Sequence, residues 1–157
     1  MESNMVRTER DAEAFVLGLG LFATAGGGLA SRGLRLLRSL RDDGLEVAWV
    51  EPEDIDGDTL TCSVFGMGSI APHPPMTPEE KLAFGVDGER HPRPWVRALD
   101  QLERYLGERL GAVVPFELGP NNTIVAVDAA VRSGRLLVDG DYIGRALPKM
   151  SQALPAV

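Results

Sequence analysis

The chain has 157 residues, 44% of them hydrophobic, which suits one compact domain with a substantial core. A formal net charge of −7 disfavours partners with a negative surface, so we expect neither a nucleic-acid nor a membrane partner. Cys62 is the only cysteine, which excludes an internal disulfide and agrees with a reducing, cytoplasmic location.

The apolar run at residues 15–30 is the segment that comes nearest to a targeting signal. Asp11 and Glu13 precede it, where a signal peptide carries positive charge. The run is also shorter than the roughly 20 residues that a membrane span needs. We therefore interpret it as part of the folded domain, which we expect to span residues 11–157 after a flexible start at residues 1–10.

The predicted elements alternate between helices and short strands. In chain order they are helices at residues 11–25 and 29–41, strands at 45–50 and 60–65, a helix at 95–110, a strand at 112–116, a helix at 123–133 and a strand at 135–138. Residues 112–116 are apolar throughout, as expected of a central strand. The predicted fold class is α/β, a single domain with a small sheet and helices packed on its faces.

Six prolines in residues 71–94 predict a proline-rich loop rather than a regular element. Within it, Thr77 before Pro78 and two glutamates is a helix-start signature, with Thr77 as the cap. His73 and His91 also lie in this loop. No third ligand is spaced to complete a metal site with them, so we interpret both as exposed.

Loops rich in glycine and polar residues follow three predicted strands, at residues 66–69, 117–122 and 139–145. Because the carboxyl ends of parallel strands share one sheet edge, we expect Glu117, Asp139 and Asp141 to form a cluster there. Clustered carboxylates suit proton transfer or bind a hard cation, so a divalent metal stays open as a cofactor. Arg145 paired with one of these carboxylates is the purely structural alternative.

Two other features have a functional and a structural interpretation. Gly26, Gly27 and Gly28 precede a predicted helix, where free backbone amides can bind an anion. They follow a helix and lack the lysine and Ser/Thr of a P-loop, which favours close backbone packing. Cys62 lies on an apolar strand and is interpreted as buried rather than nucleophilic.

Several motifs together resemble the S-methyl thiohydantoin desulfurase-like family, found with hydantoinases and oxoprolinases. They are Gly26-Gly27-Gly28 after a helix, the Gly66-Met67-Gly68 turn, Glu80-Lys81, Glu117-Leu118-Gly119 with Asn122, and the run from Asp139 to Pro148. The last is the most specific, and the resemblance covers residues 11–150, the family's amino-terminal domain. The chain departs from the family pattern at Pro120, usually a glycine, and at Lys149, usually a glutamate.

The resemblance implies hydrolysis, or a related conversion, of a cyclic amide or thioamide of the hydantoin type. The catalytic residues it implies are Glu117, Asp139, Asp141 and Arg145. The substrate-binding residues it implies are Gly26, Gly27, Gly28, Gly68 and Asn122. Family members continue into a β-rich second domain, so we expect a partner chain to supply that domain and the tail at residues 146–157 to pack against it.

Two alternatives to this enzyme subunit stay open. The first is a non-catalytic partner that stabilises or regulates a catalytic chain, which Lys149 favours because a base replaces an acid. Asp139, Asp141 and Arg145 favour the enzyme instead. The second is a small-molecule binding module that acts alone, which the apolar tail disfavours.

Overall fold

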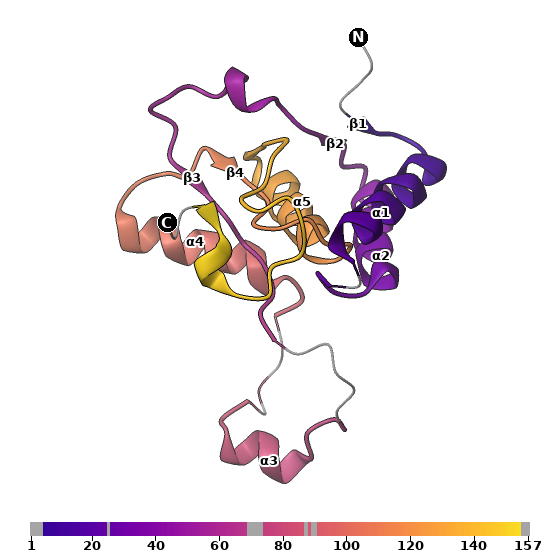
Figure 1. The fold of residues 1–157 in the computed structure, drawn as a ribbon. Helices are drawn as coiled ribbons and strands as arrows, with labels where there is room; N and C mark the ends of the chain where they lie inside the picture. Colours follow the sequence, from indigo (N-terminus) through magenta and orange to yellow (C-terminus); the bar gives the residue numbers. More distant parts are fainter. Residues whose placement is uncertain (1–4, 25, 69–73, 87, 89–90, 155–157) are drawn as a thin grey trace.

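The computed structural model describes residues 5–24, 26–68, 74–86, 88 and 91–154. In chain order, the elements of the described residues are β1 (Met5–Val6), α1 (Glu9–Ala23), α2 (Ala30–Asp42), β2 (Val47–Ala48), the 3-10 helix η1 (Pro52–Asp54), β3 (Thr61–Cys62), α3 (Pro78–Ala83), α4 (Pro94–Leu106), β4 (Ala112–Val113), α5 (Asn122–Ser133), β5 (Leu136–Leu137) and the 3-10 helix η2 (Met150–Gln152). The predicted α/β fold class is confirmed (Figure 1).

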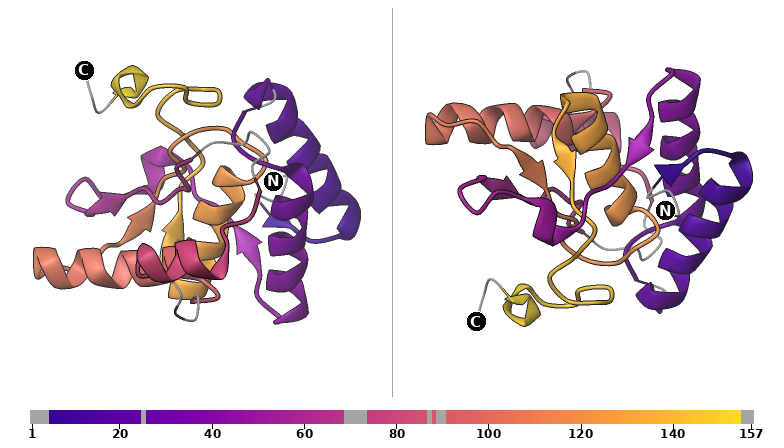
Figure 2. Two further views of the ribbon diagram at one scale, coloured as in Figure 1. Left: turned by 90° about the horizontal axis from the view of Figure 1, so that it is seen from below. Right: turned by 90° about the horizontal axis from the view of Figure 1, so that it is seen from above.

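The sheet is small and mostly parallel. β4 lies between β3 and β5 and is parallel to both, so the predicted central strand is confirmed. β1 and β2 form a separate antiparallel pair, and a parallel bridge between Val50 and Val138 links the end of β2 to β5. In the two views of Figure 2, α5 lies between the α1–α2 pair and the side of the fold that holds β3, β4 and α4.

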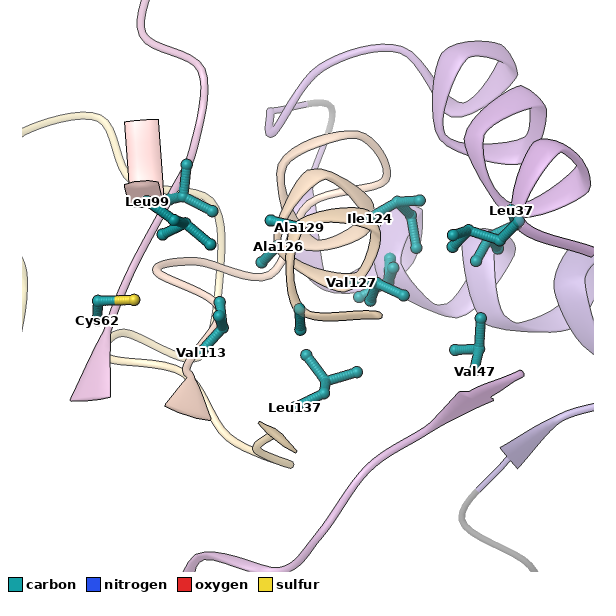
Figure 3. Packing of buried hydrophobic residues seen from close by; sticks show 14 of the residues in the cluster. Leu37, Val47, Cys62, Leu99, Val113, Ile124, Ala126, Val127, Ala129 and Leu137 are labelled. Atoms are coloured by element: carbon teal, nitrogen blue, oxygen red, sulfur yellow. The ribbon is translucent and has the colours of Figure 1, made fainter. Parts of the chain in front are cut away.

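The core is built around α5, which is buried along most of its length, from Thr123 to Ala130. Such a helix is typical of a protein interior, whereas a surface helix has one polar face. Figure 3 shows Ile124 and Val127 on the side that faces Leu37, while Ala126 lies on the side of Leu99. All five side chains are buried. The helices and the sheet therefore share one core rather than two.

A buried carboxylate ties three helices together. Asp128 of α5 is fully buried and accepts hydrogen bonds from Trp95 Nε1 of α4 at 2.6 Å and from Arg132 Nε at 2.9 Å. Arg93 Nε, at the start of α4, lies 3.5 Å from the same carboxylate. Arg132 also bonds to Asp43, the residue that caps α2, at 2.6 Å. Buried charges in proteins are paired in this way because an isolated one is costly.

The described part of the amino-terminal segment, from residue 5 onward, holds two elements that were not predicted there, and residues 1–4 lie outside the described part. Residues 5 and 6 form β1, and α1 begins at Glu9 inside the segment expected to be flexible. Thr8 caps this helix: its hydroxyl accepts the amide of Asp11, and the Asp11 carboxylate accepts the amide of Thr8. This reciprocal pair is a capping box with aspartate in place of the usual glutamate.

Two predicted element ends are also corrected. The strand expected at 112–116 ends at Val113, because Pro115 has no N–H to continue the ladder. The helix expected to run to residue 110 ends earlier, at Gly107, whose φ of 74° is the left-handed conformation that favours glycine. Leu110 is buried all the same, and its amide donates to Glu103 Oε1 at 2.8 Å.

The proline-rich loop holds the short helix α3, apart from the sheet and the other helices (Figure 1). Thr77 caps α3 as predicted, through a capping box with Glu80. His73 lies outside the described residues. His91 is exposed, and its Nδ1 accepts the amide of Arg93 at 3.2 Å. No described helix is long and apolar enough to cross a membrane.

Cys62 is buried, and its thiol is expected to be inert. Burial raises the pKa of the Cys62 thiol to about 11, so almost none of it is the reactive thiolate at pH 8. We therefore expect no measurable reaction with a chromogenic disulfide reagent in the native protein and one thiol per chain in guanidinium. Fast labelling of the native protein at pH 8 would contradict the burial of this side chain.

Candidate functional site

A pocket of about 880 Å³ lies where four separate segments of the chain meet. They are the α1–α2 turn, the segment after β3, the β4–α5 loop and the segment before η2. We call it the glycine pocket. Of the predicted site residues, it is lined by Gly26, Gly27, Gly28, Gly68, Glu117, Asn122 and Arg145.

Glu117 is buried in the wall of the glycine pocket, with 5% of its surface exposed. Its Oε1 accepts a hydrogen bond from Asn122 Nδ2 at 2.6 Å, and its Oε2 accepts one from the Leu147 amide. Asn122 also exchanges two bonds with the backbone of Gly66, at 3.1 and 3.2 Å. The Asn122 side chain thus joins the segment after β3 to the carboxylate of the β4–α5 loop.

Thr123, in the first turn of α5, holds the loop that carries Glu117. Its hydroxyl donates to the Glu117 carbonyl at 2.9 Å and accepts the Gly119 amide, also at 2.9 Å. This turn lets the chain pass from β4 into α5 within a few residues, with Glu117 facing the pocket. The loop is therefore fixed through its backbone, while the Glu117 carboxylate itself is held by Asn122 and the Leu147 amide.

The triple glycine lets two backbones touch. A Cβ on Gly27 would overlap the Cα of Gly119, and a φ of 66° at Gly27 further favours glycine. The Gly27 carbonyl accepts the amides of Asn121 and Asn122, at 3.0 and 3.1 Å. This contact supports the packing interpretation of the triple glycine. Substrate binding by Gly26, Gly27 and Gly28 stays a prediction.

Gly33 of α2 makes an even closer approach to the β4–α5 loop. A Cβ there would overlap the carbonyl oxygen of Pro120 and lie 2.9 Å from its carbonyl carbon. Pro120 is the position at which the chain departs from the family pattern. Gly33 was not predicted to make this contact, although a glycine inside an otherwise regular helix pattern is a signal of close packing.

Of the three carboxylates expected to cluster, Glu117 lines the glycine pocket, whereas Asp139 and Asp141 do not. Asp139 is exposed, and its amide donates to the Val50 carbonyl at 2.8 Å, which directs the chain along β2. Asp141 Oδ1 accepts the amides of Ile143 and Gly144 and so caps its own turn. The described residues contain no group of three or more metal-binding side chains close enough to hold an ion.

Arg145 lines the glycine pocket without an acidic partner. Its guanidinium donates to the Ala146 carbonyl at 2.8 Å and to Gln152 Oε1 at 3.3 Å. The ion pair that the sequence analysis gave as the structural alternative is absent from the described part of the chain. Arg32 and Lys149 line the same pocket, and the sequence analysis did not assign either of them to a site.

One buried polar atom beside the pocket has no partner. Asn121 lines the glycine pocket and is 7% exposed, and its Oδ1 has no hydrogen-bond donor among the described residues. Its Nδ2 makes a long contact of 3.4 Å with Asn122 Oδ1. Unpaired buried acceptors are rare in folded proteins because each costs about 1–3 kcal/mol.

The tail folds back on the domain as far as it is described, through residue 154. The Leu154 amide donates to the Tyr142 carbonyl at 3.1 Å, and Ala153 is buried. The side chains of Leu154 and Met150 stay exposed, by 70% and 45%. The described part of the tail therefore forms the turn of η2 on its own domain, with two apolar side chains exposed.

Comparison with known proteins agrees with this fold. A protein from Chromobacterium violaceum, whose X-ray structure comes from a structural genomics consortium, superposes with a TM-score of 0.68 at 24% identity. The match covers 94% of this chain and 37% of that one, so this chain spans little more than a third of that relative. Among curated proteins no match is found. Residues 10–157 match the family model described as "S-Me-THD-like, N-terminal domain". The chain belongs to the S-Me-THD-like amino-terminal domain family.

Proposed function

We propose that this domain supplies the substrate pocket of a two-part hydrolase, or related amide-transforming enzyme, that acts on a cyclic amide or thioamide of the hydantoin type. A second domain on a partner chain completes the site. The observation that carries the proposal is the placement of Glu117: a buried carboxylate, positioned by Asn122 and the Leu147 amide, in the wall of a pocket. Family membership adds the hydantoin-type substrate class.

The chemistry that Glu117 offers is proton transfer or hydrogen bonding to a ring N–H. Each carboxylate oxygen accepts one hydrogen bond from the protein and keeps a further lone pair for a ligand. A carboxylate held this rigidly can orient a ring amide and take or return its proton as the C–N bond opens. Asp139 and Asp141 take no part in this step.

The partner domain is proposed to cover the mouth of the pocket. Leu29, Met67 and Met150 line the pocket and are 67%, 77% and 45% exposed, so three exposed apolar side chains border it. Exposed apolar patches of this kind mark interaction surfaces. The relative from Chromobacterium violaceum has most of its length outside the matched part, which leaves room for such a domain.

The alternative is a non-catalytic subunit that stabilises or regulates a catalytic chain. Lys149 supports it, because it lines the pocket where the family usually carries an acid. Such a subunit would keep the fold and the exposed apolar side chains without needing the Glu117 carboxylate. The enzyme proposal therefore expects no turnover once Glu117 is neutralised, whereas the non-catalytic alternative expects turnover to continue.

The first experiment titrates the chain with hydantoin and with 2-thiohydantoin by calorimetry and by amide NMR. We expect binding with shifts at Gly66, Glu117 and Asn122, and we expect Glu117→Gln to weaken it about tenfold, the loss of one charge-assisted hydrogen bond. Glu108→Gln is the matched control, because Glu108 is exposed and outside the pocket. If neither ring binds the wild-type chain, this proposal is wrong.

The second experiment adds the partner. The chain is co-expressed with a β-rich candidate second domain, and ring opening is followed by mass spectrometry as the gain of one water. The enzyme proposal expects product from the complex and none from the complex that carries Glu117→Gln. A complex that turns over equally well with Glu117→Gln supports the non-catalytic alternative.

A further inference from the structure

The glycine pocket is positively charged on a negatively charged chain. The chain carries a formal charge of −7, yet the pocket is lined by three cations, Arg32, Arg145 and Lys149, and by one carboxylate, Glu117. A local charge opposite to the overall charge points to a ligand rather than to solubility. The excess in the pocket is two positive charges.

The side chains of these three cations have no acidic partner, unlike the arginines that form the ion pairs of the fold. Arg38 and Arg41 pair with Glu9, and Arg135 pairs with Glu103 at 2.7 Å. By contrast, the side chains of Arg32 and Lys149 form no ion pair or hydrogen bond with the described residues, and the Arg145 guanidinium meets only neutral oxygens.

The position of Arg32 adds to the local excess of positive charge. It lies in the first turn of α2, which has no acidic residue and no side-chain cap. A helix start already carries a partial positive charge, so a cation there is unfavourable on its own. A bound anion relieves this repulsion and meets Arg145 and Lys149 in the same pocket.

We propose that the ligand of the glycine pocket is an organic anion: a cyclic amide that carries a carboxylate, held by Arg32, Arg145 and Lys149. This inference rests on the proposed function and specifies its substrate class. Asn121 Oδ1 has no donor of its own but is closed off from solvent, so recognition in the pocket rests on the three cations and on Glu117. Glu117 faces the pocket for the reacting amide, and the cations face it for the carboxylate.

The experiment compares two ligands that differ in one charge. Hydantoin-5-acetate carries the carboxylate, and hydantoin-5-acetamide is its neutral counterpart. Calorimetric titration of the full chain at low ionic strength is expected to give at least tenfold tighter binding of the acetate. The difference should shrink as salt is added, because exposed charges are screened. Equal affinity for the two ligands would overturn the inference.

Charge-neutralising variants identify which of the cations bind the ligand carboxylate. Arg32→Gln and Lys149→Gln are each expected to weaken binding of the acetate about three- to tenfold and to leave binding of the acetamide unchanged. Arg35→Gln is the matched control: it removes the same charge from the exposed surface of the same helix, outside the pocket. A loss with Arg35→Gln equal to that with Arg32→Gln would mean that only the general charge of the chain matters.

The outcomes separate this inference from the proposed function. Binding of both ring compounds with equal affinity keeps the proposed function and overturns the anion site. Binding of free acetate ion as tightly as hydantoin-5-acetate keeps the anion site and overturns the cyclic-amide substrate. Failure of every probe to bind overturns both.

Discussion

Gly33→Ala is expected to destabilise the domain by about 3 kcal/mol or more. The added Cβ would overlap the Pro120 carbonyl oxygen, and it would also lie 3.2 Å from Ile124 Cγ1 in the core. A backbone carbonyl cannot turn aside as a side chain can, so α2 must move away from the start of α5. Urea unfolding followed by circular dichroism measures the loss, and the amide NMR shifts of Asn121 and Asn122 report the displaced loop.

Gly20→Ala is the matched control for this substitution. Gly20 lies inside α1, and a Cβ at that position meets nothing within 4 Å. Alanine is the better helix former by about 1 kcal/mol, so Gly20→Ala is expected to raise stability by about 0.5–1 kcal/mol. The same exchange in two helices therefore has opposite signs. A Gly33→Ala variant as stable as Gly20→Ala would show that α2 does not contact the β4–α5 loop.

Asp128→Asn is expected to cost about 3–5 kcal/mol, the range for one partner removed from a buried ion pair. Asparagine keeps the shape but replaces one acceptor oxygen with an N–H₂ donor. That donor would face either the Trp95 indole or the Arg132 guanidinium, both of which are donors. Burial lowers the pKa of Arg132, but its hydrogen bonds to Asp128 and Asp43 outweigh this and keep the pKa above its usual value.

Comparison with Asp43→Asn shows how much of the stability loss comes from the burial of Asp128. Asp43 contacts the same Arg132 at 2.6 Å, but half of its side chain is exposed. Water compensates for a lost exposed contact, so the expected cost is below about 1 kcal/mol. Chemical unfolding of both variants at pH 7 gives the two values. Equal losses would show that the interior position of Asp128 adds nothing to the bond.

The central strand and the long helix beside it were predictable from the sequence because burial follows local pattern. Residues 112–116 are uniformly apolar, and an apolar face repeats through α4, so both elements follow from periodicity. The ends of β4 and α4 could not be predicted from this pattern. Pro115 and Gly107 terminate β4 and α4 through backbone chemistry that the apolar pattern does not register.

The candidate site was predictable only in part. Glu117 and Asn122 follow from their place after a central strand, because a strand end directs the loop that follows it. Asp139 and Asp141 occupy a similar place in the sequence, but Asp141 uses its carboxylate to close its own turn. Arg32 was not predicted to belong to the site because other arginines follow it at a regular spacing on the same helix. Only the fold shows that Arg38 pairs with Glu9 whereas Arg32 lines the glycine pocket.

The contact between Gly27 and Gly119 limits which positions around the glycine pocket can vary. A Cβ on Gly119 would lie 2.5 Å from the Gly27 Cα, so neither position accepts a larger residue without moving a backbone. Gly27 in the pocket wall and Gly119 behind it are thus closed to side-chain variation. Positions such as Arg32, Met67 and Lys149 reach the pocket from exposed surface and can be exchanged without disturbing the fold. Members with different substrates should therefore diverge at these rim positions while the glycine contact stays the same, and redesign of binding preference should start there.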